Sequence, residues 1–148
     1  MSTLFAFLHH LAAFTLVAAL AVEFTLIRQE LTLASARRLQ IADMVLGIAA
    51  GLLLIVGICR VFFFEKGSEY YLHSTAFIAK FSIFILVGIL SVIPTSEFLS
   101  WNKPLRDGQV PELSANQLRL ITSIIHGELL AIVVIVLCAT IMARGGWV

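Results

Sequence analysis

Four long apolar stretches constrain the fold of this chain more than any other feature of its sequence. They lie at about 3–27, 41–63, 75–98 and 120–143. Each is long enough to cross, as a helix, a hydrocarbon core of about 30 Å. Within a bilayer only helices and closed barrels satisfy every backbone hydrogen bond. The sequence therefore predicts four transmembrane helices, with the lipid bilayer as the first partner of the protein.

The composition excludes a water-soluble protein. Hydrophobic residues make up 60% of the chain and charged residues only 13%, which is too little polar material to cover a soluble domain of 148 residues. No basic stripe is present, so nucleic acid is not an expected partner. The opening "MSTLF" has no Lys or Arg, which predicts a retained first span instead of a cleaved signal peptide.

Short connectors between the spans favour antiparallel neighbours, so the predicted fold is all-α: a four-helix transmembrane up-down bundle in a single domain, residues 1–148. Basic residues predict its orientation, because they accumulate on the cytoplasmic side. The first and third connectors hold Arg28, Arg37, Arg38, Lys103, Arg106 and Arg119. The opposite side holds Arg60, Lys66 and Arg144. We therefore expect both termini to lie outside.

Two features of the connectors and spans refine this picture. Pro104, Gly108 and Pro111 are expected to break helix in the third connector, and "SANQ" from Ser114 is expected to cap the fourth helix. "GIAAG", from Gly47 to Gly51, places two small residues four apart on the second span. Such a pair lets another helix approach closely, so it predicts either packing within the bundle or a homodimer or membrane complex through Gly47 and Gly51.

Ionisable residues inside the spans are costly unless they are paired or face the protein interior. In the predicted orientation they form two layers. The outer layer is basic and comprises His9, His10, Arg60 and Lys80. The inner layer is mostly acidic and comprises Glu23, Asp43, Glu97, His126 and Glu128. Both layers are candidate sites.

In the outer layer, one histidine is a candidate axial ligand of haem iron, because transmembrane bundles hold haem between helices. His9 and His10 diverge by about 100° on a helix, so only one of them is expected to face the bundle centre. Arg60 and Lys80 would then face propionates or an anionic substrate. The alternatives are histidines at the membrane interface, a snorkelling Lys80 and an Arg60 that anchors the end of its span.

In the inner layer, Glu23, Asp43, His126 and Glu128 are candidates for proton transfer. The alternative is a structural one: Glu23 and Asp43 would pair with nearby arginines at the membrane boundary, and the other two would form a buried hydrogen-bonded pair.

The loop "CRVFFFEKGSEYYLHS", from Cys59 to Ser74, lies above the basic layer and mixes charged residues with aromatic ones. Aromatic side chains favour the membrane interface. The loop would suit either the cap of an anion-binding pocket or an interfacial segment without a ligand.

Three segments carry a resemblance to known proteins: "FLHHLAAF", "AAGLLLIVGICRVFFFEKG" and "FIAKFSIFILVGILSVIPTSEFLSW". Over nearly the whole chain they resemble an uncharacterised bacterial family of four-span membrane proteins, a domain of unknown function. The resemblance implies a bacterial inner (plasma) membrane.

More distantly, the layout resembles HemJ-type protoporphyrinogen oxidase and CopD-like bundles. The HemJ type binds haem b through a histidine in span one and has a lysine in span three, where this chain has His10 (or His9) and Lys80. The HemJ-type aromatic-Leu-Pro-Arg stretch is absent here, since the chain reads "EFTLIRQEL", so the resemblance does not extend to the substrate.

The expected function is a haem-b-binding integral membrane protein of redox type, with an oxidoreductase as one form of it and His10 or His9 as the iron ligand. Two alternatives stay open. One is a non-enzymatic assembly factor or small subunit of a larger complex. The other is a small-ion or proton carrier that uses the acidic layer.

Overall fold

The structure is a computed structural model and describes residues 2–64 and 68–145. Its elements are α1 (Ser2–Ile27), α2 (Leu33–Cys59), the π-helical turn η1 (Arg60–Phe64), α3 (Ser68–Leu72), α4 (Thr75–Ser100), α5 (Asn102–Arg106) and α6 (Ala115–Ala143). Within these residues there is no strand, and four helices are long and apolar enough to cross a membrane. The predicted all-α, four-helix up-down bundle is confirmed.

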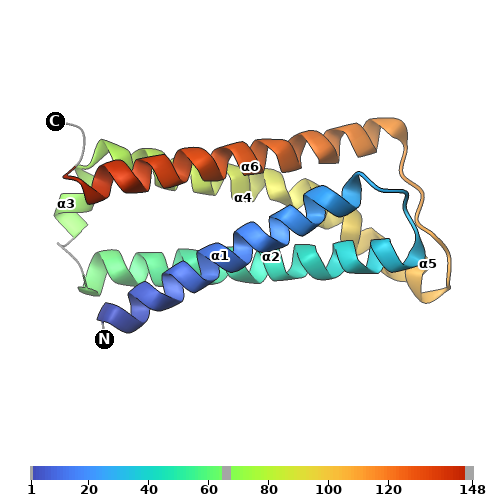
Figure 1. Cartoon of the computed structure of the whole chain (residues 1–148), viewed down its shortest axis with the longest axis horizontal. Coiled ribbons are helices and arrows are strands. Elements are labelled where there is room, and N and C mark those ends of the chain that lie inside the picture. The colour runs from blue at the N-terminus through green and yellow to red at the C-terminus, as the bar shows by residue number, and fades with distance from the viewer. Residues whose placement is uncertain (1, 65–67, 146–148) are drawn as a thin grey trace.

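The four long helices form two closely packed pairs, α1 with α2 and α4 with α6 (Figure 1). One end of the bundle carries the start of α1, the end of α6 and the short helix α3; we call it the terminal end. The other end carries α5 and the connector from α1 to α2; we call it the α5 end. The contacts of α1 with α6 and of α2 with α4 join the two pairs.

Side-chain caps fix where α2 and α6 begin. Thr32 Oγ1 accepts a hydrogen bond from the Ser35 amide at 3.1 Å, and Ser35 Oγ accepts one from the Thr32 amide at 2.8 Å. This capping box starts α2 at Leu33, ahead of the apolar stretch, so the arginine pair 37–38 lies on the first turns of α2 and not in a connector. Ser114 and Gln117 form the same motif, which confirms the predicted cap of α6.

Proline has less effect on the helices than the sequence suggests. Pro104 lies inside the one-turn helix α5, so the expectation that it breaks helix is wrong. A backbone N–H in the first turn of a helix has no acceptor within that helix. Proline, which lacks this N–H, therefore costs no hydrogen bond there. Gly108, at φ 73°, follows the end of α5 in a conformation that favours glycine. Pro94 lies within α4 without ending it.

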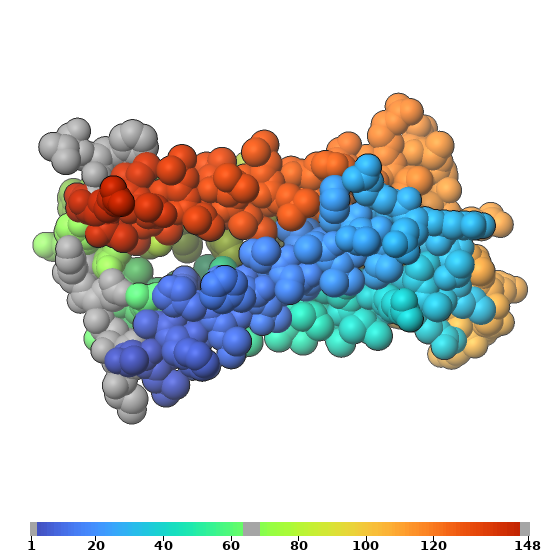
Figure 2. Space-filling view, in the orientation of Figure 1, coloured from blue at the N-terminus to red at the C-terminus, as the bar shows by residue number. Residues whose placement is uncertain are grey.

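The buried core lies toward the α5 end. It consists of Ala19, Leu20, Ile27, Ala36, Leu39, Leu46, Phe98, Trp101, Leu105, Ile121 and Ile125. Gln40 of α2 strengthens this end by donating through Nε2 to the Phe98 carbonyl at 2.6 Å and to Asn102 Oδ1 at 3.0 Å. Toward the terminal end the surface is hollowed between α1 and α6 (Figure 2). The buried core therefore lies at the level of the three buried carboxyls Glu23, Asp43 and Glu128.

Candidate proton-transfer site

Three carboxyl groups lie buried in the bundle, each on a different helix. Glu23 of α1 is 0% exposed, Asp43 of α2 is 6% exposed and Glu128 of α6 is 4% exposed. Glu23 interacts electrostatically with both other carboxyls, and Asp43 with Glu128. We call these three residues the acidic cluster. Three of the four residues predicted from the sequence as candidates for proton transfer thus lie buried in the same bundle.

Helix α4 completes the cluster with two hydroxyl groups. Thr95 Oγ1 donates a hydrogen bond of 2.8 Å to Asp43 Oδ1. Ser91, one turn earlier, places its hydroxyl near the Glu128 carboxyl, although neither oxygen of that carboxyl has a hydrogen bond of good geometry within the described residues. All four spanning helices therefore contribute to the site. The sequence alone does not indicate Thr95 or Ser91 for this site; the signal that could have identified them is a pair of hydroxyls four residues apart in an apolar span.

The acidic cluster is short of hydrogen-bond donors. Both carboxylate oxygens of Glu23 are buried, and in the part of the chain that the structure describes neither has a hydrogen-bond partner. Arg28, expected as a possible partner, is exposed and lies over the Phe24 ring at 5.1 Å. An ionised carboxylate in such surroundings is very costly unless a cation pairs with it, whereas a neutral carboxylic acid costs much less.

His126 does not join the acidic cluster. Its side chain is exposed, its Nδ1 bonds to the Thr122 carbonyl at 2.6 Å, and its ring meets Phe24 edge-on with centroids 5.0 Å apart. Glu97 is also separate, because its carboxylate accepts hydrogen bonds from Trp101 Nε1 at 3.1 Å and Gln117 Nε2 at 3.4 Å. A role for His126 in proton transfer stays a prediction.

In the basic layer, the two histidines face different ways, as their helical phase predicts. His9 is half-buried against α2, where a Cβ atom on Gly57 would lie 3.4 Å from its Cε1. His10 is exposed, and its Nδ1 bonds to the Ala6 carbonyl at 2.6 Å. His9 is therefore the histidine held between two helices.

Arg60 and Lys80 are half-buried. Arg60 begins the π-helical turn after α2, and Lys80 Nζ lies 5.3 Å from the Phe77 ring centroid. Their role toward a haem or an anionic substrate stays a prediction. Of the loop above them, Glu65 and Lys66 lie outside the described residues, and Tyr71 is buried with its ring 5.3 Å from that of Phe77.

Gly47 and Gly51 lie on an exposed face of α2. A Cβ atom on either glycine would meet nothing within 4 Å among the described residues. No other helix of the described chain therefore packs on this pair, and a homodimer through it stays a prediction.

Comparison with known proteins gives one result. Neither the curated proteins nor the solved structures yield a match. A family model described as "Predicted membrane protein (DUF2214)" matches residues 1–146. The predicted kinship with an uncharacterised family of four-span membrane proteins is confirmed: the chain belongs to the DUF2214 family of membrane proteins.

Proposed function

We propose that this protein is a proton carrier of the membrane and that the acidic cluster binds the protons. One observation carries the proposal: Glu23 is fully buried, interacts electrostatically with two other carboxyls, and has both carboxylate oxygens without a hydrogen-bond partner in the described chain. Intramembrane ionisable residues of this kind are typical of proton relays.

A proton suits the acidic cluster better than a metal ion. Metal ions need several ligand atoms converging on one point, and the described residues contain no group of three or more His, Cys, Asp or Glu side chains arranged in that way. A proton needs only one carboxylate oxygen at a time. Transfer from Glu23 to Asp43 or Glu128 would move charge between helices without any ligand shell.

The orientation predicted from the basic residues would give the carrier a direction. The acidic cluster lies in the half of the bundle toward the α5 end, because Glu23 is one turn before the end of α1. The distribution of basic residues predicts that this end is cytoplasmic in a bacterial inner membrane. The carrier would therefore exchange protons first with the cytoplasm.

Proton uptake into proteoliposomes tests the proposal. Purified protein is reconstituted with an entrapped pH-sensitive dye, and a potassium gradient with valinomycin drives proton entry. We expect wild-type vesicles to acidify faster than vesicles with Glu23→Gln, which keeps the shape of the side chain but cannot ionise. Glu112→Gln is the matched control, because Glu112 is exposed in the connector before α6. Equal rates for wild type and Glu23→Gln would end the proposal.

Haem-b binding of redox type is the second candidate function. The observation that favours it is the hollow between α1 and α6 toward the terminal end (Figure 2), the end at which His9 and Lys80 lie half-buried. In this function His9 or His10 would hold the iron, and Arg60 and Lys80 would hold the propionates. An absorbance spectrum of the haem-loaded protein tests it. A Soret band lost in the double variant of both histidines supports haem, and an unchanged band refutes this site.

A further inference from the structure

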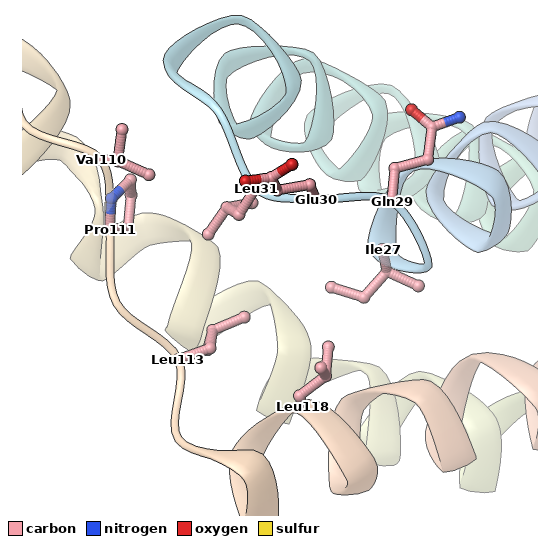
Figure 3. Close-up of a pocket in the computed structure, with 8 residues that line it drawn as sticks. All are labelled: Ile27, Gln29, Glu30, Leu31, Val110, Pro111, Leu113 and Leu118. Atoms are coloured by element: carbon pink, nitrogen blue, oxygen red, sulfur yellow. The ribbon is translucent and has the colours of Figure 1, made fainter.

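A pocket opens at the α5 end of the bundle, between the connector from α1 to α2 and the connector from α5 to α6 (Figure 3). Its volume is about 290 Å³, which is room for several water molecules. Most of its lining is apolar, and Gln29 and Glu30 contribute the polar groups. The site described above does not use this pocket.

The pocket and the acidic cluster are joined along α1. Ile27 lines the pocket and is only 4% exposed. It follows Glu23 by four residues, so the two side chains lie on the same face of α1, one helical turn or about 5–6 Å apart. One turn of α1 thus separates Glu23 from Ile27 at the pocket.

Helix α6 repeats this arrangement over a longer distance. Leu118 lines the pocket, and Ile121, Ile125 and Glu128 follow it at the spacing of one helix face. Both isoleucines are buried and belong to the same apolar core as Ile27. We call Ile27, Ile121 and Ile125 the isoleucine layer. The layer is one side chain deep on α1 and two deep on α6, so of these two helices α1 has the shorter spacing between the pocket and a buried carboxyl.

We propose that this pocket is the aqueous vestibule of the acidic cluster and that Ile27 is the apolar gate between water and Glu23. The inference rests on the proposed binding of protons by the cluster. Glu30, exposed at the rim, would collect protons from the water, and Glu23 would receive them when the Ile27 side chain moves aside. An apolar constriction blocks water while it is closed and admits it when its side chains move.

Hydrogen–deuterium exchange of the buried carboxyl tests the gate directly. The full-length protein in lipid nanodiscs is transferred to D₂O, and the carbonyl band of protonated Glu23 is followed by infrared spectroscopy, with Glu23→Gln used to assign it. Ile27→Ala shortens the gate and is expected to speed exchange by roughly fiftyfold, the effect of removing about three buried carbon atoms. Val22→Ala is the control, because Val22 is exposed on α1 away from the pocket.

A second variant protects the test against misfolding of the first. Leu118→Trp fills part of the pocket from α6 and is expected to slow exchange. Leu118 is 39% exposed, so the larger tryptophan side chain need not disturb the core. Exchange of the Glu23 band that is the same in wild type, Ile27→Ala and Leu118→Trp would overturn the vestibule.

The two proposals fail in different ways. If exchange responds to Ile27 while vesicles of wild type and Glu23→Gln take up protons equally, the vestibule stands and the carrier function falls. If no band depends on Glu23, the residue holds no proton and both proposals fall. Gated exchange together with Glu23-dependent uptake supports both.

Discussion

Thr95 of α4 donates a hydrogen bond of 2.8 Å to Asp43 of α2. This bond joins the α1–α2 pair to the α4–α6 pair in the apolar part of the bundle. It also gives one of the three buried carboxyls a donor, whereas Glu23 and Glu128 have none of good geometry among the described residues. The Thr95–Asp43 bond therefore joins the two helix pairs and orients one carboxyl of the acidic cluster.

Removing the hydroxyl of Thr95 should destabilise the protein. Thr95→Val keeps the shape of the side chain but leaves Asp43 without its donor, so we expect the free energy of unfolding to fall by about 1–3 kcal/mol. Unfolding in mixed detergent micelles, followed by circular dichroism, measures it. Thr95→Ser keeps the hydroxyl and should recover most of the loss. A Thr95→Val variant as stable as wild type would show that Asp43 gains nothing from this bond.

Replacing Glu23 by an apolar residue should stabilise the fold while it removes the proposed proton uptake. Glu23→Leu has similar volume and needs no hydrogen bonds, so we expect the free energy of unfolding to rise by about 1 kcal/mol or more. Proton uptake should fall to the level of Glu23→Gln in the same preparation. A Glu23→Leu variant that is less stable than wild type would indicate that the Glu23 carboxyl has a stabilising partner, which contradicts the absence of any hydrogen-bond partner for it among the described residues.

The sequence predicts the bundle and its acidic layer because apolar length and intramembrane charge are local properties. It could not show which ionisable residues meet. Glu128 turns inward while His126, two residues earlier, turns outward, and only the packing of α6 against the other helices decides between them. The sequence does not single out Thr95 as part of the site, because hydroxyl side chains are common in apolar helices. The apolar stretch begins at about residue 41, whereas α2 begins at Leu33, because the Thr32 cap lets the helix include Arg37 and Arg38 ahead of that stretch.

The capping box of α6 should contribute measurably to stability. Ser114→Ala removes the acceptor of the Gln117 amide, a bond of 3.2 Å, and we expect it to lower the free energy of unfolding by about 1 kcal/mol. Ser114→Asp should retain most of the stability, because aspartate also caps helices well. Ser123→Ala is the control, since Ser123 is exposed within α6 and caps nothing. Equal losses in the Ser114→Ala and Ser123→Ala variants, measured by thermal unfolding in detergent, would refute a role for the cap.

Two glycines of α2 should respond differently to the same substitution, because only one of them lies against another helix. A Cβ atom on Gly57 would already lie 3.4 Å from His9 Cε1, so the larger side chain of Gly57→Leu must push α1 away from α2. We expect a loss of about 1–3 kcal/mol in the free energy of unfolding. Gly47→Leu meets open space in the described structure and should leave the stability of the monomer nearly unchanged. Size-exclusion chromatography of the Gly47→Leu variant in detergent adds a second result. A shift from dimer to monomer would reveal the predicted Gly47–Gly51 interface, whereas a wild-type protein that is monomeric at all concentrations would rule that interface out under these conditions.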